Sequence, residues 1–205
     1  MSTVAILTIK RFDAAKQRLG DARIRPALAE AMMTDVLAAL RVSKAIDEIL
    51  IVSGEPKAKD HGRVLEDPDD GHNPAAARGI AKAVAMGATR VVLLAGDCPL
   101  VDPADLDVLL TGRGDHVVVI ADRHGTGTNG LVLSPPTAIV PSFGEGSCKR
   151  HQDLAAAAGI DCSVATGTTI ALDIDTPADL QQLIGSLDGD NAPHTRAVLA
   201  AEKIL

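Results

Sequence analysis

Short apolar runs alternate with segments of helical periodicity along almost the whole chain, and this alternation restricts the possible folds more than any other feature. Residues 4–9 form an apolar run that is typical of a central parallel strand covered on both faces. Leu28, Met32, Val36 and Leu40 then recur at the spacing of one helix face. The regular succession of such segments predicts an α/β fold with a mainly parallel sheet.

Local start and stop signals set the boundaries of the predicted elements. The predicted strands cover residues 4–9, 48–53, 64–66, 91–95, 116–121, 130–134 and 169–172. Pro26 can open a helix as its first residue, and the residues expected to cap the next four helices are Asn73, Asp102, Ser147 and Thr176. A last helix is expected over residues 192–205. The resulting architecture is a three-layer α/β sandwich with a mixed, mainly parallel sheet.

The chain length fits one domain, since 205 residues are an ordinary size for a single hydrophobic core. We therefore expect residues 1–205 to form one domain. Residues 190–205 would be a C-terminal helical extension that packs on the body or on a partner, so a homodimer is one possible assembly.

Composition excludes several classes of protein. Aromatic residues make up 1% of the chain and the net charge is −7, which argues against a nucleic-acid binder, because such proteins use stacking platforms and a basic surface. The three cysteines form no CxxC pair, so neither a zinc site nor a disulfide framework is indicated, and a reducing cytoplasm is expected. The apolar start of the chain is too short for a membrane span and lacks the pattern of a secretory signal.

Several charged residues follow directly after predicted strands. Lys10, Asp97, Asp122 and Asp173 each occupy such a position. In open α/β sheets the carboxyl ends of parallel strands form the edge where ligands bind. These four side chains are therefore expected to line one edge of the sheet.

A basic loop follows the first strand and contains Lys10, Arg11, Lys16 and Arg18. Cations at this place can hold triphosphate oxygens and neutralise charge while a phosphoryl bond breaks. A solvated basic loop is the alternative interpretation. Neither a P-loop nor a GxGxxG sequence is present, so a Rossmann dinucleotide site is poorly supported.

Acidic residues at two further strand ends suggest a metal site. Asp97 lies in a Gly-Asp-Cys-Pro sequence after residues 91–95, and its carboxylate could bind Mg²⁺. Asp173 and Asp175 are two apart, so in an extended segment both would face the same ion. A simple turn at Asp97 and a helix start at Asp175 are the structural alternatives.

Two glycine-containing loops could bind an anion. Residues 122–129 combine Asp122, exposed backbone N–H groups, Thr128 and Asn129. Residues 143–147 place Gly144 and Gly146 before Ser147, whose expected helix start would attract an anion, and His151 lies one turn further on. The alternatives are a hairpin connection for the first loop, and an ordinary serine cap with a structural histidine for the second.

The order of these pieces resembles the CofC/FbiD family, the guanylyltransferases of coenzyme F420 biosynthesis. The matching pieces run in family order, and they are residues 9–10, 15–19, 31–32, 35–37, 73–75, 96–100, Asp122, 127–129, 143–147, His151 and 173–177. Two departures from the family pattern concern the shape of the pocket. Cys98 stands where a bulkier apolar residue is expected, and His72 stands where leucine commonly precedes the asparagine.

The resemblance implies a MobA-like, GT-A-type nucleotidyltransferase fold, with GTP as donor and phosphoenolpyruvate or 2-phospho-L-lactate as acceptor. It assigns the triphosphate to Lys10, Lys16 and Arg18, and a Mg²⁺ or Mn²⁺ ion to Asp97, Asp173 and Asp175. It assigns the acceptor's phosphate and carboxylate to Thr128, Gly144 and Ser147. Asp122, Asn129, Gly146 and His151 complete the expected substrate-binding set.

Two alternatives to this function stay open. The first is another transferase of the same fold, of the cytidylyl, molybdopterin-guanylyl or sugar-nucleotide type. A Leu-x-Ala-Gly-Gly opening after the first strand is absent, which disfavours the sugar and molybdopterin types. The second is a non-catalytic nucleotide-binding regulator, which the three potential metal acids disfavour.

Overall fold

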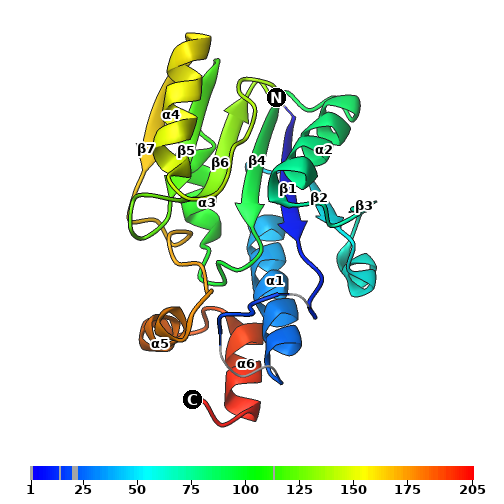
Figure 1. Ribbon diagram of the computed structural model, residues 1–205, viewed down its shortest axis with the longest axis vertical. Coiled ribbons are helices and arrows are strands. Elements are labelled where there is room, and N and C mark those ends of the chain that lie inside the picture. The colour runs from blue at the N-terminus through cyan, green and yellow to red at the C-terminus, as the bar shows by residue number, and fades with distance from the viewer. Residues whose placement is uncertain (1, 14, 20–22, 113) are drawn as a thin grey trace.

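A seven-stranded sheet forms the centre of the computed structural model, which describes residues 2–13, 15–19, 23–112 and 114–205 (Figure 1). The strands are β1 (Thr3–Ile9), β2 (Glu48–Ser53), β3 (Val64–Glu66), β4 (Arg90–Ala95), β5 (His116–Ala121), β6 (Thr128–Ser134) and β7 (Asp161–Ala165). Their order in the sheet is β3-β2-β1-β4-β6-β5-β7. Among the described strands, only β6 runs antiparallel to its neighbours, β4 and β5. The sheet is therefore mixed and mainly parallel, as expected.

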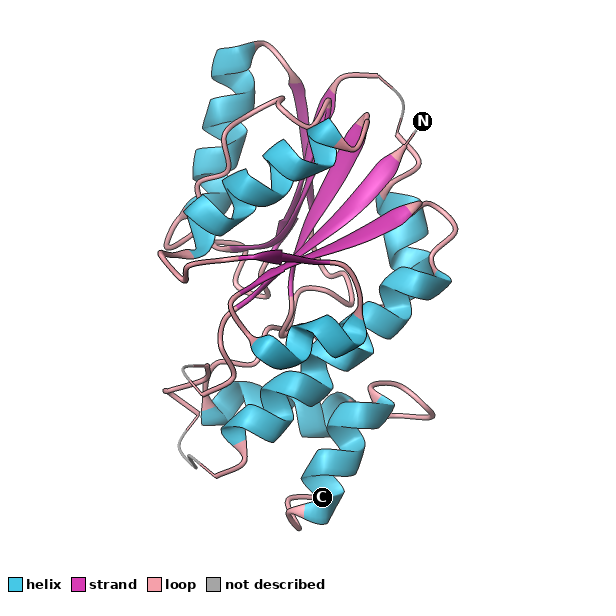
Figure 2. Cartoon of the chain, turned by 90° about the vertical axis from the view of Figure 1, so that its right-hand side faces the viewer, coloured by secondary structure: helices cyan, strands magenta, loops and turns pink. Residues whose placement is uncertain are grey.

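Helices cover both faces of the sheet, which gives three layers (Figure 2). They are α1 (Arg25–Val42), η1 (Pro56–His61, a 3-10 helix), α2 (His72–Ala85), α3 (Pro103–Leu109), α4 (Ser147–Ala158), α5 (Pro177–Ser186) and α6 (Pro193–Ala201). One core packs α1 and α3 on the sheet, and the other packs α2 and α4 on the opposite face. Alternate residues of β1 explain the division, since Leu7 enters the first core and Ile6 the second.

A third apolar cluster lies beyond the carboxyl ends of the strands. It joins the outer side of α1, through Leu28 and Met32, to Leu183 of α5 and Leu199 of α6. Figure 1 shows α5 and α6 below the sheet, with α6 beside the lower part of α1. The start of α6 is held by the buried carboxylate of Asp35, which accepts hydrogen bonds from the backbone N–H groups of residues 194 and 195 at 3.0 and 2.8 Å. The expected terminal helix thus packs on the body of its own chain.

The predicted strand at residues 169–172 is wrong, and the last strand is β7 (Asp161–Ala165). Ile170 and Leu172 are buried, but they pack as a turn and bend against neighbouring elements. The side chains of β7 are mostly exposed at the edge of the sheet, so its sequence carries no apolar run. An apolar run reports burial, whereas an edge strand can form without one.

Two predicted helix caps are also wrong. Helix α2 begins at His72 after Gly71, so Asn73 lies inside the first turn and caps nothing. Helix α4 begins at Ser147, and the capping position belongs to the left-handed Gly146. The predicted caps at residues 102 and 176 are confirmed, since both side chains accept a hydrogen bond from a backbone N–H in the first turn.

Across the described residues, none of the helices combines the length and apolar character that spanning a membrane requires.

Two helical glycines should respond oppositely to alanine. A Cβ on Gly79 of α2 would lie 2.6 Å from Ile6 Cγ2 and 3.1 Å from Val52 Cγ2, whereas one on Gly185 of α5 would meet nothing within 4 Å. We expect Gly79→Ala to lower the free energy of unfolding by about 1–2 kcal/mol, because overpacking outweighs the gain in helix propensity. Gly185→Ala should raise it by roughly 0.5–1 kcal/mol. Urea titration of both variants tests the pair, and stabilisation by Gly79→Ala would contradict the close packing.

Candidate active site

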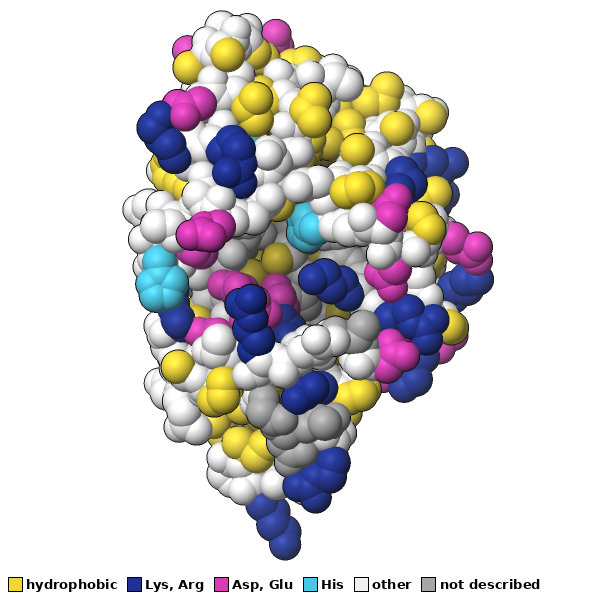
Figure 3. All heavy atoms as spheres, viewed as in Figure 1, with side chains coloured by type: hydrophobic (Ala, Val, Ile, Leu, Met, Phe, Trp, Pro, Cys, Tyr) yellow, Lys and Arg dark blue, Asp and Glu magenta, His cyan; other side chains and the backbone are white. Residues whose placement is uncertain are grey.

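A cavity of about 550 Å³ opens at the carboxyl ends of β1 and β4, beside the start of β6. Because β6 is antiparallel, its first residue reaches the edge at which the parallel strands end. Figure 3 shows this hollow near the middle of the molecule, with acidic and basic side chains gathered on its lower side. Charged groups from segments far apart in the sequence therefore meet in one cavity.

The three acids predicted to bind a metal lie together in this cavity. Asp97 follows β4, and its backbone carbonyl accepts a hydrogen bond of 3.2 Å from the N–H of Ile174. That bond fixes the segment carrying Asp173 and Asp175 beside Asp97, and all three acids line the cavity. Burial raises the pKa of Asp173, and the negative charge of Asp97 raises it further.

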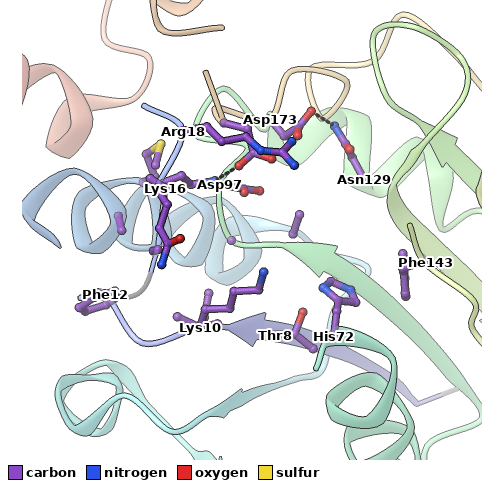
Figure 4. A pocket seen from close by; sticks show the side chains of 18 of the residues that line it. Thr8, Lys10, Phe12, Lys16, Arg18, His72, Asp97, Asn129, Phe143 and Asp173 are labelled. Atoms are coloured by element: carbon purple, nitrogen blue, oxygen red, sulfur yellow. Dashed lines mark hydrogen bonds and ion pairs between the residues drawn. The ribbon is translucent and has the colours of Figure 1, made fainter. Parts of the chain in front are cut away.

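Lys16 lies among these acids. Its ammonium forms ion pairs with Asp97 and, at 2.9 Å, with Asp175, and only 7% of its side chain is exposed. Figure 4 shows Lys16 directed at Asp97. Burial opposes the charge of Lys16, but the two carboxylates outweigh that effect and raise its pKa.

Within the described ranges, no three carboxylate, imidazole or thiol groups are placed together so as to hold a metal ion as they stand. The Lys16 ammonium instead lies between Asp97 and Asp175 and neutralises the charge of their carboxylates. The donor chemistry nevertheless fits a hard divalent cation, because these groups are carboxylate oxygens. Burial and then the like charges of Asp97 and Asp175 raise the pKa of Asp173, and a bound cation would relieve that repulsion. A metal bound here would have to displace Lys16.

The rest of the basic loop divides between the cavity and the outer surface. Lys10 and Arg18 both line the cavity and are exposed (Figure 4). Arg11 does not line it and instead pairs with Asp13 at 3.2 Å. The cations that face the acids are therefore Lys10, Lys16 and Arg18.

Asn129 and Asp122 hold protein segments in place. Asn129 lines the cavity, but its amide N–H₂ group donates to the carbonyls of Ile170 and Ala171 and, at 3.2 Å, to Asp173 Oδ1. Asp122 is not among the cavity-lining residues, and its carboxylate accepts N–H bonds from residues 124 and 126 of its own loop. The two side chains thus position the acids and the loop.

The predicted acceptor residues form two layers. Thr128 and Gly144 line the cavity, whereas Gly146, Ser147 and His151 do not. The start of α4 is not an open anion site, since the N–H groups of Ser147 and Cys148 donate to the carbonyls of residues 144 and 126. Ser147 and His151 are buried, and both contact the hydroxyl of Thr128 at 3.1 Å.

Asn73 and His72 also shape this wall, although the sequence suggested only a helix cap for the first and a departure from the family pattern for the second. Asn73 accepts a hydrogen bond from the N–H of Phe143 at 2.7 Å and donates to its carbonyl at 3.2 Å, so it holds the loop that carries Gly144. His72 lines the cavity, and its ring packs edge-on against Phe143 with 4.4 Å between centroids. The family resemblance at residues 73–75 indicated that Asn73 has a role in the site, but we had predicted a helix cap for this residue.

Burial and then the charge of Arg150 lower the pKa of His151 to about 4. An unfolded histidine has a pKa of about 6.5, so stability that is present above pH 6.5 is lost as the pH falls toward 4. We expect protonation of His151 in the unfolded chain to lower the free energy of unfolding by about 2 kcal/mol when the pH falls from 7 to 5. Urea unfolding at both pH values measures this change. Between pH 7 and pH 5, the free energy of unfolding should fall by about 2 kcal/mol less in His151→Asn than in the wild type. Equal drops would contradict the buried neutral ring.

Comparison with known proteins decides the family. The family model described as "Guanylyl transferase CofC like" matches residues 3–200. The chain belongs to this family. The match covers both strands that end at the cavity and all of the acids and cations described above, and it confirms the resemblance seen in the sequence.

Two CofC relatives and one solved structure extend this result. A phosphoenolpyruvate guanylyltransferase of Conexibacter woesei is 48% identical over 97% of this chain and 96% of its own length. A 3-phospho-D-glycerate guanylyltransferase of Phenylobacterium zucineum is 35% identical over 85% and 86%. A solved structure from Desulfovibrio desulfuricans G20, described as a "putative nucleotide-diphospho-sugar transferase", superposes with a TM-score of 0.80 at 16% identity and covers 100% of this chain and 96% of that one. The expected nucleotidyltransferase fold is thereby confirmed.

Proposed function

We propose that this CofC protein transfers GMP from GTP to phosphoenolpyruvate and releases pyrophosphate, as a step of coenzyme F420 biosynthesis. The observation that carries the proposal is the single cavity in which Lys10, Lys16 and Arg18 face three carboxylates, with Thr128 and Gly144 on the wall beside them. The 48% identical relative is named a phosphoenolpyruvate guanylyltransferase, which supports this acceptor. 2-Phospho-L-lactate is the alternative from the sequence resemblance, and 3-phospho-D-glycerate is the acceptor named for the Phenylobacterium relative.

The reaction is an in-line displacement at the α-phosphorus of GTP. The phosphate of the acceptor is largely ionised near neutral pH, so its oxygen attacks without a protein general base. Lys10 and Arg18 bind the triphosphate oxygens and neutralise the charge that builds up on the leaving pyrophosphate. Thr128 and Gly144 hold the acceptor so that its oxygen is aligned with the α-phosphorus.

We propose Mg²⁺, or Mn²⁺ in its place, as the cofactor, held by Asp97, Asp173 and Asp175. When bound, the ion supplies positive charge to the triphosphate oxygens. With the ion bound, Lys16 would be displaced from Asp97 and Asp175, and its ammonium would be free to contact the triphosphate.

One experiment tests the proposed reaction. The purified protein is incubated with GTP, Mg²⁺ and each of the three phosphorylated acids in turn, and products are identified by mass spectrometry. We expect a guanylylated product and pyrophosphate with phosphoenolpyruvate, and the same mixtures with CTP or UTP are the controls. Product with CTP or UTP but not with GTP, or no product with any of the three nucleotides, would reject guanylyl transfer. Exclusive use of one of the other two acids would reject phosphoenolpyruvate as the acceptor.

We also propose that the protein acts in the cytoplasm, which the three free cysteines support because a reducing compartment keeps thiols unpaired. The homodimer stays a prediction, and light scattering coupled to size exclusion measures it.

A further inference from the structure

The hydroxyl of Thr128 lies on the cavity wall and has two buried hydrogen-bonding partners behind it. Thr128 begins β6 and lines the cavity. Behind it, His151 Nδ1 lies 3.1 Å from Thr128 Oγ1, and the Ser147 hydroxyl donates to the same oxygen at 3.1 Å. Both partners are buried, with exposed fractions of 0% for His151 and 1% for Ser147.

The tautomer of His151 follows from its other contact. The backbone N–H of Ser142 donates to His151 Nε2 at 2.9 Å, and a backbone N–H can only donate. Nε2 is therefore unprotonated. The ring is neutral at pH 7, because burial and then Arg150 lower its pKa to about 4. A neutral ring carries one proton, which must be on Nδ1, so His151 donates to Thr128.

The direction of the Thr128 proton follows in turn. A hydroxyl oxygen accepts through two lone pairs, and His151 and Ser147 use both. In the reverse arrangement, Thr128 would donate to Ser147, and the buried Ser147 proton would have no other acceptor among the described residues. An unpaired buried donor costs about 1–3 kcal/mol, so that arrangement is disfavoured. The Thr128 O–H is left to point away from both partners, into the cavity.

We infer that His151 is a positioning residue for the acceptor acid: it fixes the Thr128 hydroxyl as a one-way hydrogen-bond donor toward the ionised oxygen of the ligand. The inference rests on the proposed function for the identity of that ligand. It goes beyond the family resemblance, because the sequence analysis placed His151 at the substrate. His151 instead acts through Thr128 and touches no ligand.

Two amide substitutions separate the two contacts of the ring. In His151→Asn the amide nitrogen can occupy the position of Nδ1 and donate to Thr128, but the acceptor for Ser142 is lost. In His151→Gln the amide oxygen can occupy the position of Nε2 and accept from Ser142, but the donor to Thr128 is lost. We expect His151→Gln to raise the KM for phosphoenolpyruvate about tenfold, since a hydrogen bond to a charged group is lost, with an unchanged KM for GTP. His151→Asn should stay within a few fold of the wild type.

A double substitution tests whether the effect passes through the hydroxyl. Thr128→Val should raise the acceptor KM by a similar factor, and adding His151→Gln to it should produce no further rise. Equal acceptor KM values for His151→Gln and His151→Asn, or additive effects in the double variant, would overturn the proposal.

The tautomer can be measured on the wild-type protein, so the test survives a variant that does not fold. Nitrogen-15 chemical shifts of the His151 ring should show a protonated Nδ1 and an unprotonated Nε2 at pH 7. A protonated Nε2 would overturn the inference even in an active enzyme. If the wild type makes no product with any of the three acids, the proposed function fails, and the shifts still decide the proton arrangement.

Discussion

Replacing Asp173 with asparagine should reduce pyrophosphate release from GTP by roughly a hundred- to a thousandfold, which is the usual cost of losing a group that stabilises transition-state charge. The folded state should not be weakened. The pKa of Asp173 is raised by burial and by Asp97, so its negative charge is disfavoured in the absence of a metal. Asparagine removes this charge and keeps an oxygen that can accept from Asn129, which bonds Asp173 Oδ1 at 3.2 Å.

The measurement combines two assays on one variant. Pyrophosphate release is followed with GTP, Mg²⁺ and phosphoenolpyruvate, and urea unfolding is followed without metal at pH 7. Asp153→Asn is the matched control, because that carboxylate is 61% exposed and pairs with Lys149 on the same exposed stretch of α4. Full activity of Asp173→Asn would remove the metal role, and loss of activity accompanied by unfolding would show that the acid is needed for structure.

Replacing Lys16 with methionine should produce two effects of opposite sign. Turnover should fall by about a hundredfold, because the proposed contact of the Lys16 ammonium with the triphosphate is lost. Binding of Mn²⁺ to the nucleotide-free protein should become tighter, because the Lys16 ammonium otherwise occupies the position between Asp97 and Asp175. Without the ammonium, the two carboxylates repel each other, so a bound cation stabilises them more strongly.

Electron paramagnetic resonance of free Mn²⁺ measures this affinity directly. Lys149→Met is the matched control, since its side chain is 76% exposed and lies outside the cavity. Unchanged or weaker Mn²⁺ binding in Lys16→Met would contradict the view that the ammonium and the metal exclude each other. Unchanged turnover would separately contradict a role for Lys16 at the triphosphate.

Most strands could be predicted because the apolar pattern of the sequence matches the residues that the fold buries. Residues 48–53, 64–66 and 116–121 were predicted with the observed boundaries. The apolar pattern failed at residues 169–172, where the buried residues pack as an irregular segment whose carbonyls accept from Asn129. It failed again at β7, whose mostly exposed side chains give no apolar signal although the backbone pairs with β5.

The candidate site was predictable where topology alone decides position. Residues that directly follow parallel strands must share one edge, and this placed Lys10 and Asp97 correctly in the cavity. The arrangement of Thr128, Ser147 and His151 was not predictable, because it depends on which of the three side chains faces the cavity. That choice is made by tertiary contacts such as the bond from Ser142 to His151, which no local spacing reports.

The reversed direction of β6 has a mechanical consequence for a two-substrate reaction. Strands β4 and β6 are neighbours, with Leu94 opposite Gly130, and adjacent strands lie about 4.8 Å apart. Asp97 follows the end of β4 and Thr128 begins β6, so both lie just beyond the last residue pair of this ladder. A donor bound at Asp97 and an acceptor bound at Thr128 would then lie at a separation that the pairing of β4 and β6 sets.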